Sequence, residues 1–188
     1  MTTQRTIADA EGDIAALVYA SDDRPDLVLC DFARHLAGSG RRVCGLVQLR
    51  DRVSGEAPGR VMVLDTWQVV DVVPAAGCRL DPQWLNQMGA RIKALITRGV
   101  DAVIVNRFGP LEAAGRGFSE AIAVASETKT PLVIAVPAFE FERWTRFSSG
   151  MTVKLDCELN KVLDWWRRVS SSATPTPAVG VRACELFK

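Results

Sequence analysis

The sequence predicts a single three-layer α/β domain, in which a mostly parallel β-sheet lies between two layers of helices. Short continuous apolar runs indicate strands buried on both faces, and amphipathic stretches of helical length separate them. The length of 188 residues is enough for one well-buried core. Strands that alternate with helices form right-handed βαβ units. We expect the domain to span residues 13–169, after a flexible N-terminus (1–12) and before a Ser/Thr/Pro linker and C-terminal tail (170–188).

The first half of the chain contains the first of these alternating elements. Residues 14–20 form an apolar run that predicts a strand, and residues 26–38 carry an apolar helical stripe. A second strand is expected at residues 42–48. Residues 60–73 are rich in valine and predict either one long strand or a hairpin.

The second half continues the alternation. Asp81-Pro82 opens a helix, because aspartate is a favourable N-cap and proline fits the first turn. The expected elements are helix 82–98, strand 101–105, helix 117–127, strand 131–136 and helix 155–168. Adjacent residues of one helix do not share a face, so we expect Trp165 or Trp166 to leave the core and cover the tail or a partner subunit.

The charge balance argues against polyanionic partners. Lys and Arg number 23 and Asp and Glu 22, so the formal net charge of +1 gives no overall field that would attract nucleic acid or a membrane surface. Any anion site must therefore be local. No apolar stretch is long enough to span a bilayer, and the polar start of the chain is unlike a signal peptide. We therefore expect a cytoplasmic protein without nucleic-acid or membrane partners.

Cysteine and histidine usage predicts no metal site. The cysteines are scattered and form no Cys-x-x-Cys pair, which argues against a disulfide framework or a zinc ribbon. His35 is the single histidine, so a multi-histidine metal centre is excluded. The five cysteines are Cys30, Cys44, Cys78, Cys157 and Cys184.

The turn after the first predicted strand, residues 20–26, lies where a P-loop nucleoside triphosphatase cradles phosphate. It has neither glycine nor lysine, and Asp22, Asp23 and Asp26 would repel a phosphate, so Mg-ATP is not expected as a cofactor. Three interpretations remain open. Asp26 could simply cap the next helix, the carboxylates could hold a cation, or Ser21 and the turn amides could touch a ligand.

The turn after the predicted strand at residues 101–105 carries a family resemblance. Residues 103–112 resemble the Walker-B segment of thermophile-type nucleoside triphosphatases, with Gly109-Pro-Leu-Glu112 matched in full. Asn106 stands where that family has its magnesium-binding aspartate, and Arg107 stands where it has its catalytic glutamate. The resemblance implies a P-loop-NTPase-like fold without a functional P-loop. Both departures remove groups that hydrolysis needs, because a neutral amide is a poor magnesium ligand and arginine cannot accept a proton from water.

A second resemblance covers residues 14–165. Across this range the chain resembles a bacterial family of unknown function that is often grouped with molybdenum-transport or nitrogenase-associated proteins. The motifs that carry the similarity are Gly45-Leu-Val-Gln48, Cys78-Arg-Leu-Asp81, Asn106-Arg-Phe-Gly109, Glu112, Gly115-Arg-Gly117, Trp144 and Phe147. The link to molybdenum is what this resemblance implies.

The chemistry of the turns points to an oxyanion pocket. Arg79, Arg107 and Arg116 precede or flank two helix N-termini, where backbone amides are free and the helix dipole is positive. The expected ligand-binding residues are Arg79, Asn106, Arg107, Gly109, Glu112, Gly115, Arg116 and Gly117, with Ser21, Cys78 and Trp144 as further candidates. The alternative is that the three arginines pair in solvent with Asp81, Glu112 and Glu120, respectively.

Together these features favour a non-hydrolytic binding protein for a small oxyanion of the molybdate or tungstate type, or for a phosphorylated ligand. Two other functions remain open. One is a nucleoside-triphosphatase-like enzyme that uses Glu112 and a nonstandard phosphate loop. The other is a regulatory subunit whose exposed aromatic side chains bind a protein partner. The sequence is compatible with a homo-oligomer but does not specify one.

Overall fold

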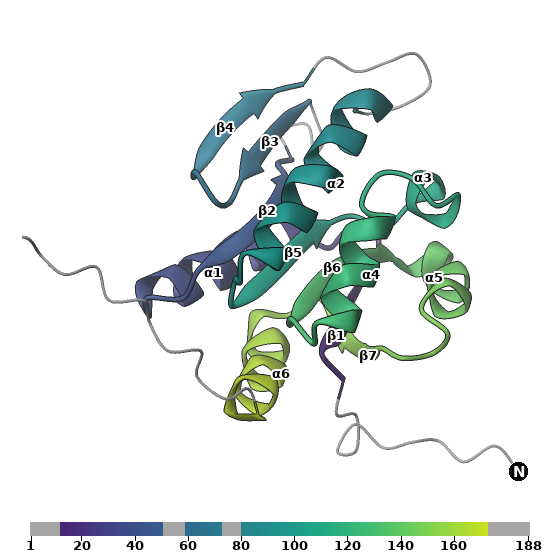
Figure 1. The fold of residues 1–188 in the computed structure, drawn as a ribbon. Helices are drawn as coiled ribbons and strands as arrows, with labels where there is room; N and C mark the ends of the chain where they lie inside the picture. Colours follow the sequence, from purple (N-terminus) through teal and green to yellow (C-terminus); the bar gives the residue numbers. More distant parts are fainter. Residues whose placement is uncertain (1–11, 51–58, 73–79, 173–188) are drawn as a thin grey trace, which may run out of the picture.

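The computed structural model describes residues 12–50, 59–72 and 80–172, and they form one sheet with helices on both faces (Figure 1). The sheet has seven strands in the order β4-β3-β2-β5-β6-β1-β7. The parallel strands are β1 (Ile14–Tyr19), β2 (Val43–Gln48), β5 (Ala102–Asn106), β6 (Leu132–Pro137) and β7 (Val153–Asp156). Strands β3 (Arg60–Val63) and β4 (Gln68–Asp71) form an antiparallel hairpin at one edge. The predicted fold class is confirmed, and residues 60–73 contain the hairpin rather than one long strand.

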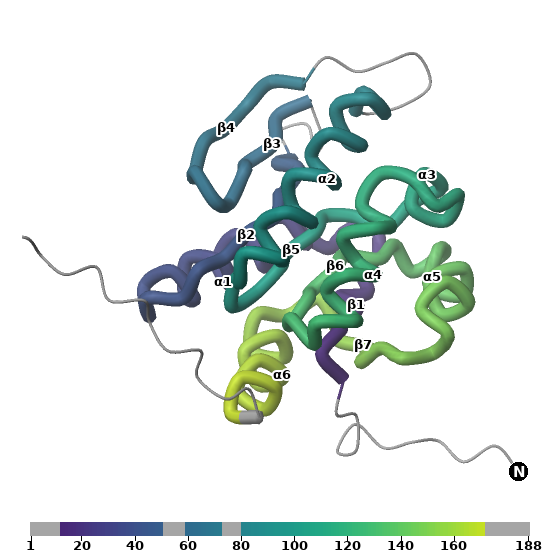
Figure 2. Tube along the Cα trace, viewed as in Figure 1, coloured from purple at the N-terminus to yellow at the C-terminus, as the bar shows by residue number. Residues whose placement is uncertain are grey.

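The helices divide into two layers, which the chain path in Figure 2 makes easy to follow. Helices α1 (Pro25–Gly38) and α6 (Leu159–Ser172) pack on one face of the sheet. The helices that contribute buried side chains to the other face are α2 (Pro82–Thr97), α4 (Ser119–Glu127) and α5 (Phe141–Phe147). The short helices α3 (Pro110–Ala113) and η2 (Ala138–Glu140) follow β5 and β6. In the described part of the chain, no helix combines the length and apolarity needed to cross a membrane.

Strand β7 was not expected, because residues 155–168 predict a helix. The structure places a strand at Val153–Asp156, paired in parallel with β1, and helix α6 begins only at Leu159. The four residues of β7 alternate between buried and exposed, as in a strand with one solvated face. A pattern this short is not distinguishable from the first turn of an amphipathic helix, which explains the error.

The two tryptophans of α6 are both in the core, so the expectation that one would leave it is wrong. Trp165 is 1% exposed and Trp166 is 8% exposed. The indole Nε1 of Trp165 donates a hydrogen bond to the carbonyl oxygen of Gly12 at 3.0 Å, and Trp166 packs edge-on against Phe32 of α1. Helix α6 contacts both the sheet and α1, so neighbouring residues about 100° apart around the helix each find an apolar partner.

Candidate functional site

The carboxyl ends of the parallel strands meet at one edge of the sheet, which is the usual position of ligand sites in open α/β sheets. The turn after β1, the end of β2 and the turn after β5 all lie at this edge. Three polar segments that are far apart in the sequence are thereby brought to one side of the molecule. The fourth expected segment contains Cys78 and Arg79, which lie outside the described residues.

The turn after β1 is held by hydrogen bonds from its own side chains and from Arg50. The Asp23 carboxylate accepts a hydrogen bond from the backbone amide of Ala20 at 2.7 Å. From the end of β2, the Arg50 guanidinium donates to the carbonyl oxygens of Asp23 at 3.0 Å and Ser21 at 3.4 Å. Ser21 is exposed, and its hydroxyl donates to Asp22. A phosphate cradle needs amides that point outward, whereas in this turn a carboxylate already takes one of them.

Asp26 anchors the start of α1 without being its N-cap. The N-cap is Arg24, and Asp26 lies inside the first turn, so the expectation that Asp26 caps this helix is wrong. Asp26 is 2% exposed and accepts two hydrogen bonds from Arg24, at 2.9 and 2.8 Å, and one from the backbone amide of Arg50. Burial alone would raise the pKa of Asp26, but the hydrogen bonds from Arg24 and the Arg50 amide lower it below its ordinary value.

Asn106 ties two strand ends together. Its side chain is buried, and Nδ2 donates to the carbonyl oxygen of Gln48 at 3.2 Å. The position that corresponds to the Walker-B aspartate therefore holds neighbouring backbone in this protein. Such a contact stabilises the turn but leaves no carboxylate for a metal ion.

Gln48, the last residue of β2, carries a buried donor on its side chain. The residue is 6% exposed, and its Nε2 has no hydrogen-bond acceptor in the part of the chain that the structure describes. Leu46 pairs with Val105 in the β2–β5 ladder, and Gln48 and Arg107 each lie two residues beyond this pair. An unpaired buried amide costs about 1–3 kcal/mol, so its retention at a ligand-binding edge requires an explanation.

Arg107 follows β5 at this edge and is half-buried. Within the described ranges its guanidinium forms no salt bridge. Burial raises the pKa of Glu112, and the positive charge of Arg107 opposes this rise. Glu112 is buried, so the alternative of a solvated Arg107–Glu112 pair is not what the structure contains.

Glu112 has a structural role beneath this turn. It is 4% exposed, and its Oε2 accepts a hydrogen bond from the backbone amide of Gly109 at 3.0 Å. Burial raises the pKa of Glu112 above its ordinary value, although hydrogen bonds from backbone amides, including those of Phe118 and Gly109, and the charge of Arg107 act in the opposite direction. A carboxylate engaged with two neighbouring amides is not free to serve as a general base, which argues against the enzymatic alternative.

The amides before α4 are not free, contrary to expectation. The amide of Gly117 donates to Oδ1 of Asn86 on α2 at 2.8 Å, and the amide of Phe118 acts on the Glu112 carboxyl to lower its pKa. Gly117 has a φ of +60°, and a Cβ at this position would collide with the Glu112 carboxylate. Gly117 therefore allows the Glu112 carboxylate to lie close to the backbone. The sequence had predicted that a ligand would approach the backbone here.

The remaining predicted residues in the described ranges are Gly115, Arg116 and Trp144. Arg116 and Gly115 are exposed in the turn before α4, and Glu120, the partner considered for Arg116, pairs with Lys93 instead. The described contacts give Arg107 and Arg116 no common partner. Trp144 is fully buried on α5.

Trp144 belongs to an aromatic cluster that supports the turn after β5. Its ring packs against Phe108 at a centroid distance of 5.1 Å and against Phe147 at 5.7 Å. Like Gln48 Nε2, its indole Nε1 is a buried donor without an acceptor among the described residues. The cluster therefore packs Phe108, the residue next to Arg107, into the core.

Gln48 and Arg50 are site residues that sequence reasoning missed. Both follow the apolar run of β2, and a glutamine that ends such a run is a weak signal for a polar group at the ligand-binding edge. The hydrogen bonds of Arg50 to the turn after β1 join segments about thirty residues apart, which no local pattern could reveal.

Comparisons with known proteins agree with this architecture. The profile of a family described as "Protein of unknown function (DUF2478)" matches residues 14–165. A curated relative, the molybdenum import ATP-binding protein ModC 2 of Bradyrhizobium diazoefficiens, is 33% identical over 180 residues, which are 90% of this chain but only 20% of that protein. The solution structure of a human cancer-related nucleoside triphosphatase aligns with a TM-score of 0.53 and 16% identity, covering 85% of this chain and 98% of that one. This last similarity shows a P-loop-NTPase-like fold.

Proposed function

The chain belongs to the DUF2478 family of proteins of unknown function, and from this premise we propose that it is a non-hydrolytic binding domain for a small oxyanion of the molybdate or tungstate type. The fold is that of P-loop nucleoside triphosphatases. The name of the curated relative supports a ligand from molybdenum metabolism, although the chain spans only a fifth of that protein. We expect the domain to act in the cytoplasm.

The observation that carries the proposal is the pair of donors at the ends of β2 and β5. Among the described residues, Gln48 Nε2 is buried without an acceptor, and Arg107, which follows the end of the neighbouring strand β5, has no salt bridge. A tetrahedral oxyanion offers several acceptor oxygens, so it can accept hydrogen bonds from a neutral amide and a guanidinium fork together. Binding would satisfy the donor that is otherwise left unpaired.

Three contacts support a non-hydrolytic role. Asp23 takes an amide of the turn after β1, Asn106 holds the backbone of β2, and Glu112 accepts hydrogen bonds from backbone amides. In the P-loop-NTPase-like fold, Asp23 lies in the turn that corresponds to the phosphate loop, and Asn106 lies at the position of the magnesium ligand. Glu112 is a carboxylate near that position. Each side chain already makes an internal contact, so phosphoryl transfer would require all three to be displaced.

Calorimetric titration of the purified protein with molybdate, tungstate, sulfate and phosphate tests the proposal. Arg107→Ala should weaken binding of the best anion by roughly tenfold to a hundredfold, because a charge-assisted hydrogen bond contributes about 1.5–3 kcal/mol. Arg107→Lys should recover part of this loss, since lysine keeps the charge but loses the planar fork. Arg34→Ala is the matched control, because Arg34 is exposed on α1 and pairs with Asp31.

Gln48→Met separates ligand binding from a purely structural cost. Removal of an unpaired buried donor should leave the thermal midpoint unchanged or higher, while anion affinity should fall by about tenfold. If none of the four anions binds the wild type, the proposed function is wrong. If an anion binds with equal affinity to wild type and Arg107→Ala, both folded, the site lies elsewhere.

A further inference from the structure

The antiparallel hairpin of β3 and β4 ends the sheet, and among the described residues β4 pairs with β3 alone (Figure 1). A terminal strand carries a row of backbone N–H and C=O groups that point away from the sheet. Such an edge can accept another strand unless charged side chains, proline or a covering element prevent it. The outward groups of β4 and the side chains beside them therefore decide whether the sheet can be extended.

The hydrogen bonds of the hairpin fix which residues of β4 point outward. The amide of Val72 donates to the carbonyl oxygen of Gly59, and these two residues continue the β3–β4 register. Bonded pairs alternate along an antiparallel ladder, so Val70 bonds to β3 as well. The N–H and C=O groups of Val69 and Asp71 therefore point away from the sheet.

The other side of β3 leads to the same assignment. The amide of Leu64 donates to the carbonyl oxygen of Gly45, and these two residues continue the β2–β3 register. The even-numbered residues of β3 therefore bond to β2, and the odd-numbered residues bond to β4. One of the odd-numbered residues is Val61, the register partner of Val70. Hydrogen bonds on both sides of β3 thus leave the same backbone groups of β4 without a partner in the described residues.

The two edges of the sheet carry different side chains. Strand β7 forms the other edge, and its exposed residues are Lys154 and Asp156. On the β4 edge, Val69 is 43% exposed, and Trp67 in the preceding turn is 41% exposed. Charged side chains oppose the addition of a strand, whereas β-branched and aromatic side chains favour strand pairing. The β7 edge is therefore protected by charge, and the β4 edge is suited to pairing.

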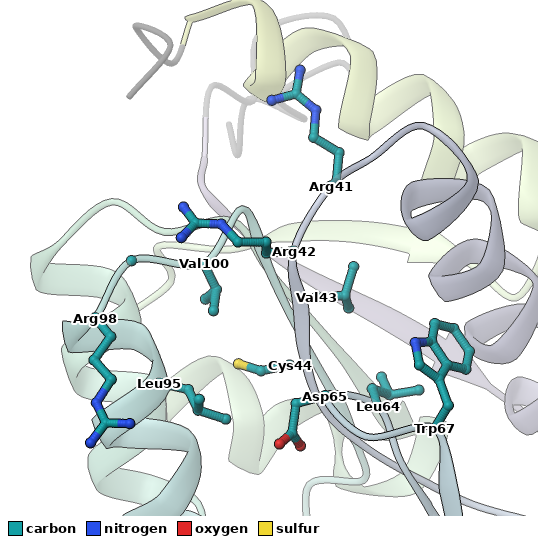
Figure 3. Close-up of a pocket in the computed structure, with 11 residues that line it drawn as sticks. Arg41, Arg42, Val43, Cys44, Leu64, Asp65, Trp67, Leu95, Arg98 and Val100 are labelled. Carbon is teal, nitrogen blue, oxygen red and sulfur yellow. The ribbon is translucent and has the colours of Figure 1, made fainter. Parts of the chain in front are cut away.

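Trp67, in the turn of the hairpin, lies toward a face of the sheet. Figure 3 shows its indole beside Leu64 and Val43. Both of these residues belong to the core on the α1 side of the sheet. The indole therefore leaves the outer edge of β4 open.

Asp71 is the one charged residue of β4, and its charge is partly offset within the hairpin. The guanidinium Nε of Arg60 lies 3.9 Å from the Asp71 carboxylate. Without this neighbour, the carboxylates of two approaching β4 strands would repel each other. The edge is thus compatible with a second strand of the same sequence.

We propose that β4 pairs antiparallel with β4 of a second copy of this chain, so that the sheet continues across a two-fold axis at Val70. In this register Val69 of each copy lies opposite Asp71 of the other. All the outward N–H and C=O groups of these two residues then have partners, because they are placed symmetrically about Val70. The two half-buried Val70 side chains become neighbours on the α2 side, as a close pair of β-branched residues. This interface does not depend on the proposed oxyanion site.

Sedimentation equilibrium of the full chain tests the proposal. One short strand pair makes a small interface, so we expect a reversible dimer with a Kd of about 10–100 µM, measured between about 5 and 500 µM protein. NMR saturation transfer from water to amides identifies the groups involved. Transfer to Val69 and Asp71 should fall as the dimer forms, whereas the Val70 amide should show little transfer at any concentration. A monomer throughout this range, as expected if the edge instead accepts an unrelated strand, would overturn the proposal.

Two opposite charges at one position test the register. Val69→Asp places a carboxylate opposite Asp71 of the other copy and should weaken the dimer at least tenfold. Val69→Lys places an ammonium there and should keep the affinity of the wild type or raise it. Met151→Asp is the matched control, because Met151 is 67% exposed just before β7 at the other edge. Equal weakening by Val69→Asp and Val69→Lys would contradict this register, and equal weakening by Met151→Asp would contradict pairing through β4.

A cysteine at the axis provides a second test of the register. The Cα atoms of a non-hydrogen-bonded antiparallel pair lie about 4.5 Å apart, within the range that a disulfide spans. Val70→Cys should therefore form a disulfide-linked dimer under mild oxidation. Gln68→Cys is the control, because residue 68 lies two residues from the axis and does not face its own copy. Cross-linking of Gln68→Cys but not of Val70→Cys would overturn the proposed pairing.

Discussion

Glu112 lies in a part of the chain where sequence similarity points to chemistry, yet its contacts are structural. Because Glu112 accepts a hydrogen bond from the part-buried Gly109 amide, Glu112→Ala would leave this donor without its acceptor. We expect the free energy of unfolding to fall by about 1–3 kcal/mol, the cost of one unpaired donor. Urea denaturation monitored by circular dichroism measures this change.

The control for Glu112 is Glu120→Ala on the same side of the sheet. Glu120 is exposed and pairs with Lys93 on the surface, so its loss should change stability by less than about 1 kcal/mol. Equal effects of the two substitutions would show that the buried carboxylate does not organise the turn.

Single residues differ in how far the sequence revealed them. The replacement of acidic residues by Asn106 and Arg107 was readable, because identity alone states that a magnesium ligand and a base are missing. The role of Glu112 could not be read from the sequence. The amide of Phe118 approaches Glu112 only after the chain has turned through Gly115 and Gly117. The unpaired amide of Gln48 was equally hidden, because burial is a property of the folded chain.

At the scale of elements, the start of α1 depends on one buried carboxylate. Asp26→Ala removes the acceptor of three hydrogen bonds from Arg24 and Arg50. We expect a loss of about 2 kcal/mol in the free energy of unfolding, because hydrogen bonds to charged groups contribute about 1.5–3 kcal/mol and Arg24 keeps partial access to water. Thermal melts at neutral pH measure the difference.

The pH dependence of Asp26 follows from its lowered pKa. A depressed carboxylate pKa contributes stability above the ordinary aspartate value of about 3.9, and this contribution is lost as the pH falls through the folded-state pKa. The stability difference between wild type and Asp26→Ala should therefore narrow below about pH 4. A difference that stays constant down to pH 2 would show that the pair with Arg24 is not ionic in origin.

Elements with long apolar or amphipathic patterns were predicted well, and short ones were not. Strand β6 and helix α2 have the continuous burial and the capped amphipathic sequence that their patterns indicate. Strand β7 was missed, since four alternating residues fit both the two-residue period of a strand and the 3.6-residue period of a helix. The hairpin of β3 and β4 required tertiary information, because its turn carries Trp67 with positive φ in place of the usual glycine or asparagine.

At the scale of the whole molecule, a P-loop-NTPase-like fold occurs together with a turn after β1 that contains neither glycine nor lysine. We expect no magnesium-dependent release of phosphate from ATP or GTP above the background of a heat-inactivated sample, because the lysine and both carboxylates are missing. A malachite-green assay with a functional P-loop enzyme as the positive control measures this. Turnover in the ordinary enzyme range that disappears in Glu112→Gln would contradict the non-hydrolytic assignment.

The attachment of the β3–β4 hairpin has a consequence for how the protein opens. Strand β3 pairs with β2 over three residue pairs, and β4 pairs with β3 alone, whereas β1 and β6 are matched along six. Backbone amides of the hairpin should therefore exchange with deuterium through local opening, well before those of β1, which require global unfolding. Leu64 belongs to this loosely held unit, although its side chain is fully buried. The same fluctuation that exposes these amides should therefore also expose the Leu64 side chain to solvent.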